Sequence, residues 1–177
     1  MPSSPPKRVI AVGSAIGHAI AIAYILTLFL LIPPFDQDPS VAQRLALAIK
    51  SAILPGFMFM VGIAFLAKDR FYGQANNPMV CETDGAKMKV DARYLSNTHE
   101  QFVLFLINAF ALAIFLPTPC LTLLPIYGSL FAVGRMVFWI GYRIHPLYRA
   151  PGFTMCFGPA IAAMVFNVYA LLVSLFA

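Results

Sequence analysis

The main pattern along the chain is a succession of long apolar segments separated by short polar ones. Five segments are long enough to cross a bilayer, whose hydrocarbon core of about 30 Å requires about 20 apolar residues in a helix. They comprise residues 9–32, 45–67, 97–116, 121–142 and 153–176. The pattern predicts an all-α, polytopic membrane protein with five transmembrane helices.

The first apolar segment has an alternative interpretation as a cleavable signal peptide. Its apolar run of about 24 residues is longer than the roughly 7–15 residues typical of a signal sequence, so we expect a retained transmembrane helix. The segment also contains Gly13-x-x-x-Gly17, and this spacing of small residues permits two helices to approach closely.

The distribution of Lys and Arg between the loops predicts the orientation. With five spans, the N-terminus, the 68–96 loop and the 143–152 loop lie on one side and carry nine of the 12 Lys and Arg residues. The opposite side carries only Arg44. Positive loops stay in the cytoplasm, so we expect a cytoplasmic N-terminus and a C-terminus on the opposite side. Without the second span, Lys7 and Arg8 would lie on the opposite side of the membrane from the positive 68–96 loop. The charge distribution therefore favours five spans over four.

Composition supports the membrane assignment and excludes some functions. The 177-residue chain is 60% hydrophobic and 11% charged, whereas soluble domains are about 45–50% apolar and about 25% charged. The net charge of +5 does not indicate nucleic-acid binding, because the basic residues do not cluster on a soluble face and no binding motif is present. We interpret Cys81, Cys120 and Cys156 as free thiols without metal-ligand spacing.

A polar stripe lies at the start of the third apolar segment. Arg93, Asn97 and Glu100 stand at positions i, i+4 and i+7, which share one face of a helix, whereas His99 points away from that face. Charged side chains at membrane depth usually face the protein interior or a wet cavity. The alternative is a helix cap, with Ser96 or Asn97 at the N-cap and Glu100 in the first turn.

A second stripe runs along the fourth segment. Arg135, Phe138, Tyr142 and Arg149 stand at i, i+3, i+7 and i+14, and Arg135 lies deep within an apolar run. A buried arginine requires an anionic partner, for which Glu100 and the carboxylate of a ligand are the candidates. We expect the two stripes to converge near one face of the membrane.

Two sequence regions that contain these stripes resemble a known family. ARYLSNTHEQFVLFLINAFAL and GRMVFWIGYRIHPLYRAPGF are similar to the signature regions of the MAPEG superfamily, membrane-associated proteins in eicosanoid and glutathione metabolism. The resemblance covers roughly residues 45–177 and implies a four-helix transmembrane domain there, preceded by an extra N-terminal helix and connector in residues 1–44. It also implies a homotrimer that binds glutathione between subunits near the cytoplasmic face.

The first signature region implies several glutathione contacts. Arg93, Asn97 and Glu100 match residues that hold the glutathione backbone, with Glu100 on the amino group and arginines on the carboxylates. Gln101 replaces a tyrosine that is common in the family. Arg70 is a weaker match to a contact supplied by the neighbouring subunit.

The second signature region implies the reactive part of the site. Arg135 and Tyr142 match further glutathione contacts, and Phe138 stands where a tyrosine is common, so one hydroxyl is missing. Arg149 matches the arginine that stabilises the thiolate, and a nearby cation lowers the pKa of a thiol.

The resemblance leaves two functions open. The first is a glutathione-dependent transferase or peroxidase that takes a lipophilic electrophile from the membrane lipids. The second is a non-catalytic protein that binds a lipid or partner proteins. It would be similar to the mattrin-like members, which share the extra first span. A transporter is a weaker possibility, because no inverted repeat with broken helices is visible.

Overall fold

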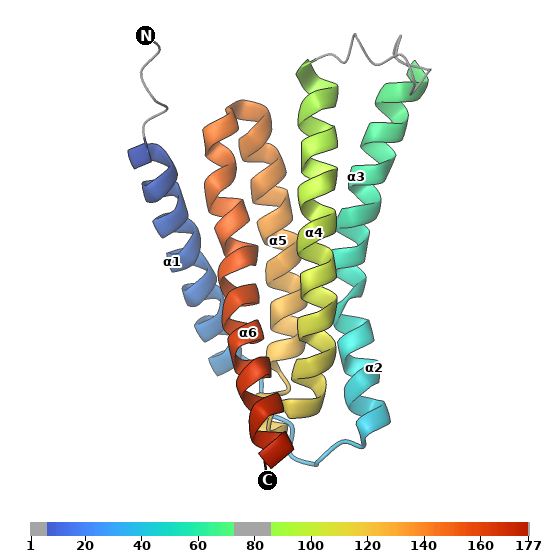
Figure 1. The fold of residues 1–177 in the computed structure, drawn as a ribbon, viewed down its shortest axis with the longest axis vertical. Coiled ribbons are helices and arrows are strands. Elements are labelled where there is room, and N and C mark those ends of the chain that lie inside the picture. The colour runs from blue at the N-terminus through green and yellow to red at the C-terminus, as the bar shows by residue number, and fades with distance from the viewer. Residues whose placement is uncertain (1–6, 73–85, 177) are drawn as a thin grey trace.

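The computed structural model describes residues 7–72 and 86–176, and within these ranges all regular structure is helical (Figure 1). Cys81, which we interpreted as a free thiol, lies outside the described residues. The elements are α1 (Lys7–Leu31), α2 (Val41–Ser51), α3 (Ile53–Tyr72), α4 (Ala86–Phe115), α5 (Leu123–Ile144) and α6 (Ala150–Phe176), with the short 3₁₀ helices η1 (Thr118–Cys120) and η2 (Pro146–Arg149).

Within the described residues, five helical segments are long and apolar enough to cross a membrane, as the hydrophobic pattern predicts. Helices α1, α4, α5 and α6 each supply one crossing, and α2 with α3 supply another over Val41–Tyr72. The break between α2 and α3 lies at Ala52, whose N–H donates to the carbonyl oxygens of Ala48 and Ile49. Pro55 has no N–H to donate to the carbonyl of Ser51, which explains the interruption at this point. The protein is therefore an all-α, polytopic membrane protein.

Helix α4 corrects one predicted boundary. It begins at Ala86 rather than near Asn97, so Asn97 lies well inside a 30-residue helix. The alternative in which Ser96 or Asn97 caps the helix is therefore wrong. The first turns of α4 are held by polar contacts, because buried Asp91 pairs with Arg143 at 2.7 Å. A hydropathy pattern cannot predict a membrane helix whose first turns are anchored by an ion pair.

The helices run lengthwise and place the start of α1 and the end of α6 at opposite ends of the bundle (Figure 1). The start of α1, the end of α3, the start of α4 and the α5–α6 connection share one end, called here the upper end. The apolar core lies lower in the bundle, where Phe105 of α4 packs on Tyr127 and Phe131 of α5.

Helix α1 docks against α6 of the same chain through its two small residues. A Cβ added to Gly13 would lie 3.2 Å from the Cβ of Ala150, and one added to Gly17 would overlap Thr154 Oγ1 and the carbonyl oxygen of Pro151. The Thr154 hydroxyl donates to the carbonyl oxygen of Ser14 at 3.2 Å. The Gly-x-x-x-Gly pattern therefore serves packing within one chain and places α1 beside the α5–α6 connection.

Candidate functional site

A polar cavity of about 450 Å³ lies at the upper end of the bundle. Its walls come from α1, α4, α5, η2 and the first turns of α6, so it collects side chains from both predicted stripes. The predicted site residues that line it are Arg93, Asn97, Glu100, Phe138, Tyr142 and Arg149. The expected convergence of the two stripes is therefore present within a single chain.

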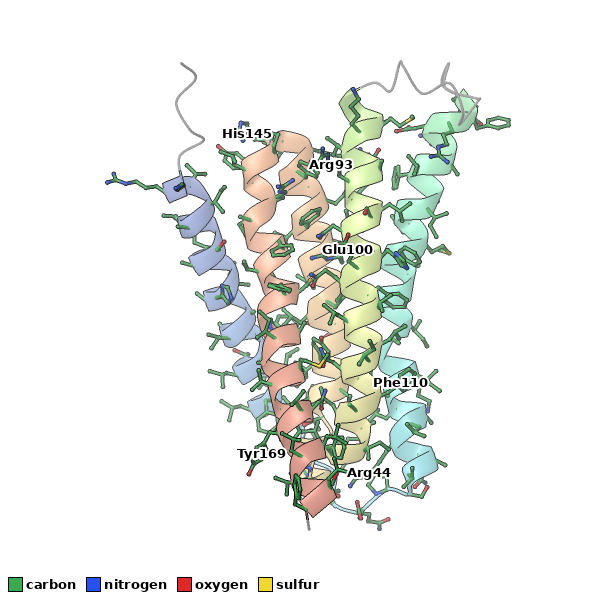
Figure 2. All side chains as sticks on the ribbon, viewed as in Figure 1. Arg44, Arg93, Glu100, Phe110, His145 and Tyr169 are labelled. Carbon is green, nitrogen blue, oxygen red and sulfur yellow. The ribbon has the colours of Figure 1, made fainter. Side chains whose placement is uncertain are left out.

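Helix α4 supplies the charged wall of the polar cavity. Arg93 and Glu100 are exposed and lie on α4 in the upper half of the bundle (Figure 2). Seven residues of helix separate their backbones by about 10 Å along the axis. Neither side chain forms a hydrogen bond or ion pair with another residue in 7–72 or 86–176. An arginine and a glutamate at this spacing can therefore each bind an opposite charge on one small molecule.

Arg135 lies behind the cavity wall rather than in it. It is fully buried, and its Nη1 donates to Asn97 Oδ1 at 2.8 Å. Its Nε donates to the sulfur of Cys156 at 3.3 Å, and its Nη2 to the carbonyl oxygen of Gly152 at 3.5 Å. Arg135 therefore fixes the orientation of the Asn97 amide, which itself lines the cavity.

The ion pair between Arg135 and Glu100, one of the two partners considered for Arg135, is absent from the described residues. The guanidinium carbon of Arg135 instead lies 4.9 Å from the ring centroid of Phe138 and 5.5 Å from that of Phe131. Aromatic faces and neutral acceptors accommodate this charge, because the negative face of each ring attracts a cation. Glu100 is on the exposed face of α4 and remains available to a ligand.

Arg149 reaches the cavity because η2 folds back over the end of α5. Gly141 has no side chain where the carbonyl oxygen of Tyr148 packs, so the connection can lie directly against α5. The Arg149 guanidinium then lies 5.0 Å from the ring centroid of Tyr142. This arrangement places an exposed cation beside an aromatic ring at the cavity wall.

Two predicted site residues lie away from the cavity. Gln101 is one position past Glu100, so its side chain turns into the bundle, where its Oε1 is buried without a partner among the described residues. Arg70 is in the last turn of α3 and does not line the cavity. His99 also lies off the cavity, with its ring 5.5 Å from that of Phe59.

Other lining residues were not predicted from the sequence. Ile10 and Ser14 of α1 form part of the wall, as do Phe153 and Thr154 of α6. Ser14 is next to Gly13, so the Gly-x-x-x-Gly pattern was the available signal that this face of α1 meets another helix. The partner helix could not be identified without the tertiary structure.

Metal chemistry has no support in the part of the chain that the structure describes. No group of three His, Cys, Asp or Glu residues there could hold a metal ion. Cys120 and Cys156 are free, as the sequence analysis predicts. The exposed Arg93 and Glu100 can pair with the opposite charges of a zwitterionic molecule, and the guanidinium of Arg149 can pair with an additional anion.

Comparisons with known proteins identify the family of the chain. Transmembrane protein 79 (mattrin) of Mus musculus is 25% identical to the chain over 138 residues, covering 77% of the chain and 35% of that protein. The Bos taurus transmembrane protein 79 is 24% identical over 165 residues, which cover 92% of the chain and 40% of that protein. The chain thus spans less than half the length of these curated relatives, and no solved structure matches it. The profile of the MAPEG family matches residues 40–169, which begin after α1 and include every α4 and α5 residue of the cavity. Because this match covers more than half of the sequence, the chain belongs to the MAPEG family.

Proposed function

We propose that the polar cavity binds glutathione and that the protein is a glutathione-dependent transferase or peroxidase acting on lipophilic electrophiles. The observation that carries the proposal is a set of three charges on the walls of one cavity, none of which forms an ion pair with another residue that the structure describes: Arg93, Glu100 and Arg149. Its volume of about 450 Å³ is within the usual range of roughly 300–1,000 Å³ for small-molecule sites. Family membership supports the same ligand class.

The charges of glutathione fit the donor set of the cavity. The tripeptide carries one ammonium group and two carboxylates. Glu100 would accept hydrogen bonds from the ammonium, while Arg93 would donate to a carboxylate, and both contacts are charge-assisted. Asn97, held by Arg135 at 2.8 Å, would supply a fixed amide for the peptide backbone. The departures from the family pattern are Phe138, which has no hydroxyl, and Gln101, which turns into the bundle.

Arg149 would be the residue that stabilises the thiolate. Glutathione supplies the nucleophilic sulfur, and a nearby guanidinium lowers the pKa of a thiol by favouring its charged form. Contact with the Tyr142 ring restricts the Arg149 side chain, whose charge remains exposed in the cavity. We further propose that the active form is a homotrimer, that the upper end faces the cytoplasm, and that the electrophile enters from the bilayer.

Calorimetry on the purified protein tests ligand binding directly. We expect glutathione to bind the wild-type chain, and Glu100→Gln to weaken this binding by about tenfold or more, because a charge-assisted hydrogen bond contributes about 1.5–3 kcal/mol. Lys89→Gln is the control, since Lys89 is on the same helix about three turns from Glu100 and does not line the cavity. Absence of glutathione binding to the wild-type protein would contradict the proposal.

Conjugation of a generic electrophile tests the role of Arg149. Arg149→Ala should lower kcat by about a hundredfold while changing glutathione affinity much less, because loss of one group that stabilises developing charge typically costs about 10²–10³ in rate. The pH profile should also move to higher pH, since the thiol of bound glutathione loses its cation. Full activity in Arg149→Ala would exclude this assignment.

The similarity to the curated relatives motivates a second candidate function. Both are named transmembrane protein 79, and the extra helix α1 lines the cavity. The protein would then be non-catalytic, and its cavity or surface would bind a lipid or partner proteins. A lipid that copurifies in the polar cavity, together with failure of glutathione to displace it, would favour this function over the first.

A further inference from the structure

A second hollow lies on a different face of α1 from the polar cavity. This α1 groove has a volume of about 390 Å³, and its walls include Arg8, Val12 and Ile16 of α1, Leu147 and Tyr148 of η2, and Pro151 of α6. The two hollows share Leu147, but the α1 residues that line them are different. The family match begins at residue 40, so one whole wall of the groove lies outside the matched region.

The walls of the groove are held together by close packing. Gly13 lies between them, where an added Cβ would be 3.2 Å from Ala150 Cβ and 3.3 Å from Pro151 Cδ. One turn further along, the Thr154 hydroxyl lies 3.2 Å from the carbonyl oxygen of Ser14 and 3.1 Å from those of Ala150 and Pro151, so α1 and α6 are also in polar contact there. The groove is therefore a preformed feature of the fold, built from two helices that touch along their backbones.

The α1 groove is charged at one end and apolar along the rest of its length. Arg8 is its one charged wall residue, and it is exposed with no hydrogen bond or ion pair to any residue that the structure describes. Val12 is 58% exposed and Ile16 is 49% exposed. From Arg8 to Ile16 the groove extends about 12 Å along α1. Tyr148 at its rim is 52% exposed, and tyrosines are common at the membrane–water interface.

We propose that the α1 groove is a binding site for an anionic phospholipid of the surrounding bilayer. The lipid phosphate pairs with Arg8 at the membrane surface, and an acyl chain lies along Val12 and Ile16 toward the bilayer centre. Charge complementarity selects the anionic headgroup, and the long apolar wall selects a lipid over a free anion. This site is separate from the polar cavity and does not depend on glutathione binding.

Native mass spectrometry of the full chain in detergent tests the headgroup contact. Phosphatidylglycerol and phosphatidylcholine are titrated against the wild-type protein, Arg8→Gln and Lys7→Gln. We expect tighter binding of phosphatidylglycerol and a loss of about fivefold in Arg8→Gln, because one basic residue near a lipid surface contributes about that factor. Lys7→Gln removes the same charge at the adjacent residue, which does not line the groove, and should change binding much less. Equal losses in the two variants would overturn the proposal.

A second pair of variants tests the acyl-chain contact. Ile16→Trp should fill the groove and reduce the bound phosphatidylglycerol, whereas Ile20→Trp lies one turn further along the same exposed face, outside the groove, and should not. Unchanged melting temperatures will show that both variants fold. If Ile16→Trp binds phosphatidylglycerol as well as Ile20→Trp does, or if the wild type does not distinguish the two lipids, the site is not as proposed.

Discussion

Arg135 is the residue whose environment differs most from the expectation for a buried charge. It is fully buried, yet its partners in the described structure are an amide, a thiol, a carbonyl and two aromatic faces rather than a carboxylate. A buried ion requires good compensation for lost hydration, which here is divided among several neutral groups. The strongest of these contacts is the 2.8 Å hydrogen bond to Asn97, which links Arg135 to the polar cavity.

Substitution of Asn97 tests this link at the level of one hydrogen bond. Asn97→Ala leaves a buried guanidinium group without its acceptor and should destabilise the protein by about 1–3 kcal/mol. Asn97→Asp supplies a carboxylate at the same position and should be at least as stable as the wild type. Thermal unfolding in detergent provides the measurement. Equal stability of Asn97→Ala and the wild type would show that the hydrogen bond contributes nothing.

At the level of elements, the association of α1 with α6 depends on the absence of a side chain at Gly17. We expect Gly17→Ala to destabilise the protein by about 1–3 kcal/mol, because the new methyl group overlaps Thr154 Oγ1 and the Pro151 backbone. Gly56→Ala is the matched control, since its nearest neighbour would be Phe102 Cζ at 3.8 Å. That variant should be neutral or stabilised by roughly 0.5–1 kcal/mol, the usual advantage of Ala over Gly within a helix.

Comparison of the two melting temperatures separates steric overlap from helix propensity. Both substitutions add the same methyl group to a helix, so only the surroundings differ. If Gly17→Ala melts at the same temperature as Gly56→Ala, the contact between α1 and α6 is looser than the structure shows. Loss of the α1 groove in Gly17→Ala should also reduce phosphatidylglycerol binding, which connects this element to the proposed lipid site.

The connector between α1 and α2 is fastened to the lower end of the bundle by an acid-sensitive contact. Asp38 accepts hydrogen bonds from the Thr118 hydroxyl and from Arg44, and these lower the pKa of Asp38 below its ordinary value of 3.8. Arg44 also donates to the Leu116 carbonyl oxygen at 2.7 Å and so supplies a hydrogen-bond donor to a carbonyl group just past the end of α4. Arg44 lies at the end of the bundle opposite Arg93 (Figure 2).

A carboxyl group with a lowered pKa stabilises the fold above its unfolded pKa, and this stabilisation is lost as the pH falls through the folded pKa. We therefore expect the wild-type melting temperature to fall as the pH decreases below about 3.8. Asp38→Asn should remove this part of the pH dependence. Asp36→Asn, in the same connector, should retain it. The prediction is wrong if the melting temperatures of Asp38→Asn and the wild type fall by the same amount over this pH range.

For the whole molecule, five crossings place the start of α1 and the end of α6 at opposite ends of the bundle. The positive-inside rule predicts that the N-terminus faces the cytoplasm. In sealed vesicles with their cytoplasmic face outward, added protease should remove an N-terminal tag and leave a C-terminal tag intact. Detergent should make both tags accessible. Protection of the N-terminal tag, with cleavage of the C-terminal tag, would reverse the proposed orientation.

Much of the architecture was predictable because membrane crossing is a property of local sequence. Long apolar runs specify helices wherever they lie, so the five helical segments of the described structure that are long and apolar enough to cross a membrane were predicted. The start of α4 was not predicted, because Asp91 is buried through contacts with Arg143 and Trp139, which are about fifty residues away in sequence. Gln101 is about 100° further around the helix than Glu100, so its side chain turns into the bundle, and the ligand contact that the resemblance implies for it stays a prediction.

The sequence by itself determined which residues can share a helix face, since this follows from a repeat of 3.6 residues per turn. It therefore specified Arg93, Asn97 and Glu100 as one stripe, and Phe138 and Tyr142 as part of another. Only the tertiary structure decided that these stripes meet in one cavity, that Arg135 stands behind Asn97 rather than beside Glu100, and that α1 closes the wall. These relations depend on how helices distant in sequence pack together, and packing is decided by close contacts such as Gly17 against Pro151 that no local pattern contains.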